Sequence, residues 1–100
     1  MRVISKQTLR RFCESAPGRQ DARRALEAWH REARRAAWTS PQDIKRLYAS
    51  ASVLKGGRIV FNICGNRYRL VVRINFSQGI VFVRFVGTHA QYDAIDAETV

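Results

Sequence analysis

Residues 58–86 constrain the fold more than any other stretch of the chain, because apolar and polar residues alternate there around two turn signals. Gly65-Asn66 separates two alternating runs, and a two-residue loop of this composition is typical of a tight β-hairpin. Gln78-Gly79 is a second and weaker turn signal. The stretch therefore predicts three antiparallel strands joined by two tight turns.

The two turns also predict which residues face each other, since successive side chains of a strand point to opposite faces. The first turn places Asn62 opposite Arg69 and Arg58 opposite Arg73, and the second places Arg73 opposite Arg84. A one-residue slip, or a three-residue loop at residues 77–79, would mix arginines into the core, so we reject both. The predicted apolar face consists of Ile59, Phe61, Ile63, Tyr68, Leu70, Val72, Ile74, Phe76, Val81, Val83 and Phe85. The predicted polar face carries Arg58, Asn62, Arg67, Arg69, Arg73, Asn75 and Arg84, with Val60, Val71, Phe82 and Val86 between them.

Three arginines, Arg58, Arg73 and Arg84, form a predicted row across the polar face. Like charges directly opposite each other destabilise a sheet, by up to about 1 kcal/mol per pair. No acidic residue is interleaved to neutralise this row. A surface that binds an anion would explain it. The alternative is an ordinary solvated face, on which arginine is common, and we favour the anion-binding interpretation.

The charge of the whole chain points to the same kind of ligand. Its 18 Lys and Arg against 8 Asp and Glu give a formal net charge of +10, and the only lysines are Lys6, Lys45 and Lys55. Arginine has a planar guanidinium that suits phosphate and stacks on bases. This balance favours nucleic acid or an acidic protein as the partner. The length predicts one domain, residues 1–100, with a single modest core.

Several classes of protein are disfavoured by what the sequence lacks. The apolar stretch after Met1 is too short for a signal peptide, and no run approaches the length of a membrane span. We therefore expect no membrane association and a cytoplasmic location. Cys13 and Cys64 have neither CxxC spacing nor a histidine at ligand spacing, so we expect free thiols, no metal site and no cofactor.

The first half of the chain predicts a helical hairpin. Arg2–Ile4 can form a short strand, and Ser5 can cap a helix that Pro17-Gly18 ends. A second helix is predicted from about Gln20 to Trp38, on which His30 is expected to be solvated among arginines. The apolar stripe of that helix is Ala22, Leu26, Trp29, Ala33 and Ala37. The antiparallel pair can cover the apolar face of the sheet, which predicts an α+β fold.

Shorter elements are predicted after the hairpin. Ser40–Asp43 is a helix start with a cap, a proline and an acid in the first turn. The buried side of that helix is predicted to be Ile44, Leu47 and Tyr48. Ala51–Leu54 can add a short strand, and Lys55-Gly56-Gly57 is a loop that brings a cation to the sheet edge. Thr88 can cap a final helical turn.

That final turn contains His89, Tyr92 and Asp93 within five residues. On a helix, His89 and Asp93 are one turn apart and share a face, so each can transfer or orient a proton near neutral pH. Tyr92 can hydrogen-bond a phosphate or stack on a base. The same residues also fit a simple capped helix start with Tyr92 packed on the core, and both interpretations stay open at this point.

Cleavage of RNA without a metal fits these side chains better than metal-dependent nuclease chemistry. The acidic residues are scattered along the chain, whereas a metal-dependent nuclease holds its ions with converging carboxylates. RNA carries its own nucleophile, the 2′-hydroxyl beside the scissile phosphate. A basic face with one histidine, one tyrosine and one aspartate can align that group, neutralise the phosphate and move protons. Such a site would not cleave DNA.

Three motifs in the second half resemble one protein family. The segments GNRYRLVV, VRFVGTH and HAQYDAID together resemble the HigB toxins of type II toxin–antitoxin systems, in the RelE-like superfamily. The helical first half is compatible in length and order. The resemblance implies a small antiparallel or mixed sheet with a helical hairpin on one side.

The resemblance also implies an activity and partners. It implies an mRNA interferase, an endoribonuclease that enters the ribosomal A site beside ribosomal RNA and cuts translated mRNA without a metal. A HigA-type helix-turn-helix antitoxin is expected to hold the toxin inactive. Operator DNA is expected to be bound only through the toxin–antitoxin complex.

Carried onto this sequence, the family pattern places the basic substrate surface on Arg69, Arg73 and Arg84, with Lys55 nearby. The predicted catalytic residues are His89, Tyr92, Asp93, Arg84 and Arg73. The predicted RNA-binding residues are Arg69, Arg67, Arg58, Lys55 and Asn62, and Asn66 matches a further motif asparagine. We expect His89 or Asp93 as the base, the two catalytic arginines on the phosphate, and Tyr92 as an orienting or stacking group. Cys64 is expected at the edge of the substrate side.

Two other functions remain open on the sequence. One is a non-catalytic RNA- or ribosome-binding module, in which the positive charge acts only electrostatically. The other is a decayed toxin that retains only the binding of its antitoxin.

Overall fold

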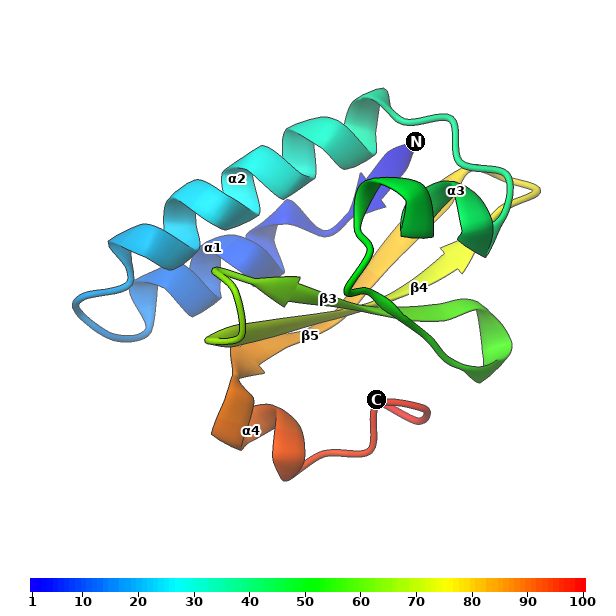
Figure 1. The fold of residues 1–100 in the computed structure, drawn as a ribbon. Coiled ribbons are helices and arrows are strands. Elements are labelled where there is room, and N and C mark those ends of the chain that lie inside the picture. The colour runs from blue at the N-terminus through cyan, green and yellow to red at the C-terminus, as the bar shows by residue number, and fades with distance from the viewer.

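A five-stranded mixed sheet organises the computed structural model, which describes residues 1–100 (Figure 1). The sheet is flanked by helices, as the predicted α+β fold requires. The elements follow in the order β1 (Arg2–Ile4), α1 (Lys6–Glu14), α2 (Gln20–Arg35), α3 (Pro41–Leu47), β2 (Ser52–Val53), the 3-10 turn η1 (Lys55–Gly57), β3 (Arg58–Ile63), β4 (Tyr68–Asn75), β5 (Ile80–Thr88) and α4 (His89–Asp93).

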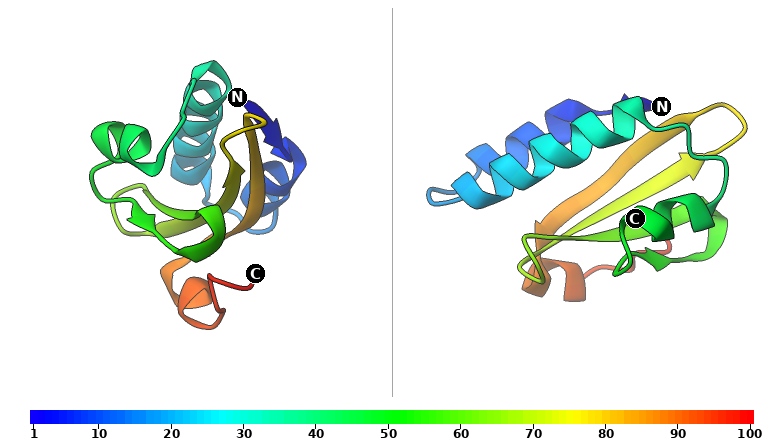
Figure 2. Two further views of the ribbon diagram at one scale, coloured as in Figure 1. Left: turned by 90° about the vertical axis from the view of Figure 1, so that its right-hand side faces the viewer. Right: turned by 45° about the horizontal axis from the view of Figure 1, so that its top comes forward.

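The strands lie in the order β1-β5-β4-β3-β2, so the three long strands predicted from residues 58–86 form the centre of the sheet. β1 runs parallel to β5, and every other neighbouring pair is antiparallel. The α1–α2 hairpin covers one face, while α4 and the segment after it lie on the opposite face (Figures 1 and 2). No helix combines the length and the apolar character needed to cross a bilayer.

The register of the first predicted hairpin is confirmed. Arg58 faces Arg73 and Asn62 faces Arg69 across β3 and β4. The left-handed backbone conformations of the turn fall on Cys64 (φ 54°) and Gly65 (φ 65°), one residue earlier than the predicted Gly65-Asn66 pair. Because the pairing on either side is unchanged, this shift does not alter which side chains share a face.

The second hairpin differs from the prediction in its turn. Asn75 faces Ile80, so the loop consists of the four residues 76–79 instead of Gln78-Gly79 alone. The side chain of Asn75 stabilises this longer loop, because its Oδ1 accepts hydrogen bonds from Ser77 Oγ at 2.8 Å and from the main-chain N–H of Gln78 at 3.0 Å. Such local side-chain bonds favour a turn that simple alternation does not predict.

A β-bulge then changes the alternation within β5. Val72 of β4 faces Val83, whereas the preceding residue, Val71, faces Phe85. Arg84 has no partner on β4 and is the extra residue of the bulge. A bulge of this kind leaves one residue unpaired and turns the following side chains to the other face. The prediction for this part of β5 was therefore wrong.

The loop and the bulge change the predicted pairing in different ways. Because the loop has four residues, Arg73 faces Phe82, and the predicted pairing of Arg73 with Arg84 does not form. Because of the bulge, Phe85 and Val86 exchange faces relative to the prediction: Val86 packs against the core beneath the helices, and Phe85 packs with Val71 on the opposite side. The apolar residues predicted for β3 and β4 do lie beneath the helices.

The helical half follows the sequence closely, with a shorter second helix. Ser5 caps α1 by accepting the N–H of Gln7 at 3.0 Å. α2 ends at Arg35, not Trp38, because the backbone is extended from Ala36 onward (ψ 154°). This extended segment leaves the predicted stripe residue Ala37 exposed and turns Trp38 into the core, where it is only 5% exposed.

Aromatic side chains fill the centre of the core. Phe61 is fully buried, and its ring lies 5.0–6.4 Å from those of Tyr48, Trp29 and Trp38. Tyr48 thus occupies the predicted buried side of α3, together with Ile44. Leu47, predicted to be buried there, is 67% exposed, because a seven-residue helix can direct only part of its length toward the core.

Replacing Gly57 by alanine should destabilise the protein by about 1–3 kcal/mol. Gly57 has φ +76°, and a Cβ built there would lie 2.8 Å from the main-chain oxygen of Ile74. Gly56→Ala is the matched control, since Gly56 also has a positive φ (+71°) but its Cβ would meet only Arg58 Nη1, at an ordinary 3.7 Å. Urea denaturation should show the larger loss for Gly57→Ala. Equal midpoints for the two variants would contradict the role given to the Ile74 contact.

Candidate active site

The short helix α4 displays the histidine and aspartate predicted from the sequence. Thr88 caps it in a reciprocal capping box, in which Thr88 Oγ1 accepts the N–H of Gln91 at 3.2 Å and Gln91 Oε1 accepts the N–H of Thr88 at 2.8 Å. His89 and Asp93 therefore lie one turn apart, with 3.1 Å between His89 Nδ1 and Asp93 Oδ2. Their side chains are 46% and 61% exposed, so a ligand can reach both.

The contact with Asp93 involves only one nitrogen of the His89 ring. A carboxylate on Nδ1 orients the ring and leaves Nε2 as the nitrogen available to a substrate. The main-chain N–H of His89 donates to the oxygen of Arg67 at 3.1 Å, which fixes the start of α4 beside the start of β4. The pair is thus exposed, and it has the geometry that a group able to transfer protons requires.

Arg69 is the basic residue that the structure brings to this end of the sheet. Its Cζ lies 5.6 Å from the centre of the Tyr92 ring, and its Nη1 donates to the side-chain oxygens of Asn62 and Asn66. Asn62 and Asn66 thereby orient the guanidinium, so Asn66 does more than form the turn. The predicted residues Arg69, Asn62 and Tyr92 form one cluster, and Tyr92 connects it to the helix that carries His89 and Asp93.

The remaining predicted arginines lie toward the opposite end of the same face. Arg58 Nη2 donates to the main-chain oxygen of Val100 at 2.8 Å, and Arg84 Nε donates to the same oxygen at 3.2 Å. Arg73 is exposed and makes no hydrogen bond or ion pair within the protein, and Lys55 is likewise exposed nearby on η1. Arg58 and Arg84 are therefore bound to the C-terminal residue of the chain, whereas Arg73 and Lys55 make no such contact.

The C-terminal segment separates these two groups of polar residues. Ala97 is buried against Val60 and Val71 of the sheet, with Ile95 and Val100 packed around them. An apolar patch therefore lies between Arg69 and the predicted row of Arg58, Arg73 and Arg84. Arg69 and Arg73 lie four positions apart on β4, which is about 13 Å at the usual rise of a strand. Arg69, not Arg73 or Arg84, is the arginine at the histidine end.

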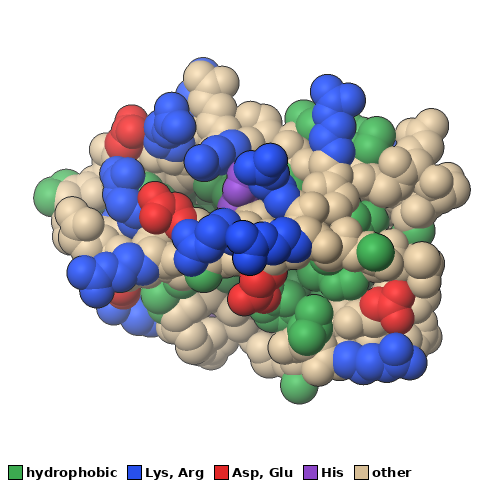
Figure 3. Space-filling model, turned by 90° about the horizontal axis from the view of Figure 1, so that it is seen from above, with side chains coloured by type: hydrophobic (Ala, Val, Ile, Leu, Met, Phe, Trp, Pro, Cys, Tyr) green, Lys and Arg blue, Asp and Glu red, His purple; other side chains and the backbone are tan.

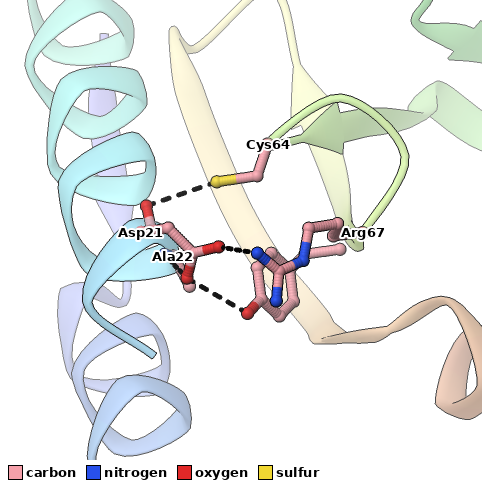
Figure 4. A network of polar contacts seen from close by, with 5 residues as sticks. Asp21, Ala22, Cys64 and Arg67 are labelled. Atoms are coloured by element: carbon pink, nitrogen blue, oxygen red, sulfur yellow. Dashed lines mark hydrogen bonds and ion pairs between the residues drawn. The ribbon is translucent and has the colours of Figure 1, made fainter. Parts of the chain in front are cut away.

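Two residues predicted for the substrate side belong to the helix side instead. Arg67 forms an ion pair with Asp21 at the start of α2, and Cys64 Sγ approaches the main-chain oxygen of Asp21 at 3.3 Å (Figure 4). Tyr68 Oη donates to Asp21 Oδ1 at 3.2 Å. Because the turn bends toward α2, Arg67 is engaged away from the predicted RNA-binding face, and Cys64 does not border it.

The Asp21 network perturbs the protonation of its members. Partial burial alone would raise the pKa of Asp21, but the N–H of Ala22 (2.8 Å), Arg67 and the Tyr68 hydroxyl hold that pKa below its ordinary value of 3.8. Burial and the nearby carboxylate raise the pKa of the Cys64 thiol and of the Tyr68 phenol. Asp21 is therefore ionised at neutral pH, and it joins α2 to the first hairpin.

Asp21→Asn should lower stability at neutral pH and lose its effect in acid. A carboxyl whose pKa is lower in the folded state stabilises the fold above its unfolded-state pKa, and this stabilisation disappears as pH falls. Thermal unfolding of variant and wild type should therefore converge as pH drops below 3.8. Glu14→Gln, which removes an exposed carboxylate that makes no ion pair, is the control and should change stability at neutral pH less than Asp21→Asn does. A constant gap for Asp21→Asn would contradict the network.

Sequence reasoning missed the role of the C-terminal segment. Its only signal was the pair of apolar residues Ile95 and Ala97 after the capped helix, too short a pattern to predict where the segment packs. The structure also contains no group of three or more His, Cys, Asp or Glu side chains that could hold a metal ion.

Comparison with known families decides which class of protein this is. A family model for HigB toxins, described as the RelE-like toxic component of a toxin–antitoxin system, matches residues 22–95, about three quarters of the chain. The chain belongs to the HigB toxin family. The match covers α2, the central strands and α4, hence both the sheet face and the His89–Asp93 pair of this HigB toxin. As the toxic component of such a system, it has an antitoxin as its partner. No curated protein matches the chain.

Proposed function

We propose that this HigB toxin is a metal-independent endoribonuclease that cleaves translated mRNA on the ribosome. The observation that carries the proposal is the exposed His89–Asp93 pair beside the Arg69–Tyr92 cluster. A histidine and an aspartate suited to proton transfer thus lie on the same short helix as an aromatic ring that contacts an arginine. RNA needs no more from a protein than these groups, because its 2′-hydroxyl is the nucleophile.

The proposed reaction is an internal transesterification. A base removes the proton of the 2′-hydroxyl, O2′ attacks the adjacent phosphorus, and the bond from phosphorus to O5′ breaks. An acid gives a proton to the leaving O5′, so the products are a 2′,3′-cyclic phosphate and a 5′-hydroxyl. His89, oriented by Asp93, is the candidate for one of these proton transfers.

Arg69 is the candidate for stabilising the charge that develops on the phosphate. Its guanidinium retains donors beyond the Nη1 that Asn62 and Asn66 engage. Charge-assisted bonds to a phosphate oxygen are strongest where the donor is already oriented. Tyr92, which lies against Arg69, is the candidate for stacking on a base. Arg73, exposed and unpaired, is proposed to contact the RNA backbone farther along the strand.

The proposed inhibitor is a HigA-type helix-turn-helix antitoxin, with operator DNA bound only by the complex of the two proteins. The net charge of +10 supports association with ribosomal RNA as the setting of cleavage. Cleavage is proposed to occur in the cytoplasm, where translation takes place.

A modified substrate tests the reaction directly. In a reconstituted translation reaction, the wild-type toxin should cleave the mRNA and leave a 2′,3′-cyclic phosphate. An mRNA with a single 2′-deoxy nucleotide at that position should stay intact there, and chelation of metal ions from the toxin before the assay should not slow cleavage. Cleavage of the deoxy substrate at the same bond would overturn the 2′-hydroxyl mechanism.

A second candidate is an RNA-binding protein without catalysis. The observation that favours it is the position of Arg84, a predicted catalytic residue, which contacts Val100 beside Arg58 at the end of the face away from His89. Under this alternative, the toxin would occupy the ribosome and block translation without cutting the mRNA. Intact mRNA on arrested ribosomes distinguishes it from the nuclease.

Arg69→Ala should weaken RNA binding and flatten its salt dependence. Each phosphate contact to a single strand adds roughly 0.7 to the slope of log K against log salt concentration, so the slope should fall by about that amount. Binding of a single-stranded RNA at several salt concentrations measures it. Arg46→Ala is the matched control. Arg46 lies on α3 and its side chain is 78% exposed, and this substitution removes the same charge as Arg69→Ala. An unchanged slope for Arg69→Ala would contradict a phosphate contact there.

A further inference from the structure

The outer face of the helical hairpin is a second basic surface, separate from the sheet face. Residues 6–35 contain nine of the 18 Lys and Arg and four of the eight Asp and Glu, so this third of the chain carries half of the net charge. Figure 3 views this face and shows a histidine recessed among basic side chains. The sheet lies between this surface and the His89–Asp93 pair.

A hollow of about 140 Å³ lies between α1 and α2 on this face. Three cations line it, Lys6 and Arg10 from α1 and Arg23 from α2, and none of the three forms an ion pair within 4.0 Å. The only acid in the lining is Glu27. The other lining residues are Leu9, Cys13, Leu26 and His30. Unpaired like charges around one cavity repel each other unless an anion occupies it.

His30 supplies a second, independent sign of a ligand. Sequence reasoning expected it to be solvated, yet it is only 7% exposed and its ring makes no hydrogen bond to the protein. The ring nitrogens are not among the sealed, unpartnered polar atoms of the structure, so they remain open to the hollow and can pair with a ligand there. Burial lowers the pKa of His30, and the charges of Lys6 and Arg34 lower it further. A bound anion would relieve that repulsion and accept a hydrogen bond from the ring.

We propose that the α1–α2 hollow binds a phosphate group, held by Lys6, Arg10 and Arg23 with His30 as a hydrogen-bond donor. The size supports a small group, because pockets for whole drug-sized ligands are larger, roughly 300–1,000 Å³. Arginine and lysine around a tetrahedral anion are the usual recognition chemistry for phosphate. The site does not depend on the nuclease proposal, since none of its residues lies on the sheet face.

Histidine NMR with inorganic phosphate as the probe tests the site. The chain has two histidines, so the imidazole signals of His30 and His89 can be followed separately, with His89→Ala as the assignment variant. Phosphate should shift the His30 signals along a saturable curve. Arg10→Ala/Arg23→Ala should weaken this binding at least about tenfold, since each charge-assisted contact is worth about that much.

Arg24→Ala/Arg31→Ala is the matched control, because it removes the same charge from exposed positions of α2 that do not line the hollow. It should leave the His30 response nearly unchanged. If both double variants lose the response equally, the general field of the face explains it and the site is refuted. A linear, unsaturable shift of His30 also refutes it. Should Arg10→Ala/Arg23→Ala fail to fold, Lys6→Ala at an exposed position carries the same test.

Two further probes identify where the phosphate comes from. Adenosine 5′-monophosphate presents a terminal phosphate, and adenylyl-3′,5′-adenosine presents only the internal diester of an RNA backbone. Saturable shifts of His30 with both would support a site that RNA can enter. Shifts with the monophosphate alone would support a site for a free nucleotide or another phosphate monoester.

Discussion

Replacing His89 by alanine is expected to slow mRNA cleavage by about 100- to 10,000-fold, the usual contribution of a positioned acid or base. The side chain is 46% exposed and its one polar contact with another side chain is with Asp93, so the fold should be little affected. Cleavage of translated mRNA by purified toxin, with the extent of cutting followed over time, measures the rate. Expression without an antitoxin should correspondingly stop arresting growth.

Asp93→Asn serves as the graded companion of this variant. Asparagine can still contact His89 Nδ1 but carries no charge, so a smaller loss than for His89→Ala is expected. Unfolding transitions of both variants should match wild type, and ribosome binding should persist because the basic residues remain. Undiminished cleavage by His89→Ala would remove this residue from the mechanism and leave the RNA-binding alternative in place.

Phe61→Ala is expected to cost about 3–5 kcal/mol of folding free energy, as deletion of a buried aromatic ring usually does. Phe61 is fully buried on β3 and lies between Trp29 of α2, Trp38 of the extended segment and Tyr48 after α3. Its removal would leave a cavity where the helices meet the sheet. Since a domain of this size is stable by only about 5–15 kcal/mol, much of the stability would be lost.

Urea denaturation followed by tryptophan fluorescence measures this effect, because both tryptophans of the chain contact Phe61. Leu47→Ala is the control: Leu47 is 67% exposed, and its truncation should change stability by at most about 0.5 kcal/mol. If Phe61→Ala lowered the free energy of unfolding by less than the removal of one buried methyl group usually does, the aromatic cluster would not be the centre of the core.

The sequence predicted most of the fold because its elements carry local signals. The Gly65-Asn66 turn set the register of β3 and β4, the caps Ser5 and Thr88 marked α1 and α4, and the alternation from residue 58 assigned the covered face. The four-residue loop could not be predicted from alternation, because the side chain of Asn75 stabilises it. The bulge at Arg84 could not be predicted either, because Phe85 packs on the far face through long-range contacts.

The candidate site was predicted in its residues more than in its arrangement. The spacing of His89 and Asp93 led directly to their contact, since a helix places residues four apart on one side. Which arginines lie near His89 could not be predicted from sequence spacing. Whether Arg69, Arg73 or Arg84 approaches His89 depends on the turn toward α2 and on the packing of Ala97, which are long-range contacts without a periodic signal.

The extra residue in β5 determines to which face of the sheet each later side chain of the strand points. Successive side chains of a strand point to opposite faces. The single unpaired residue in β5 therefore decides on which face of the sheet Thr88 and the helix α4 lie. A deletion of one residue between Phe82 and Val86 would restore strict alternation and aim His89 toward the helical hairpin. Relatives that vary in length there must therefore compensate within the same strand to keep this imidazole on the open face.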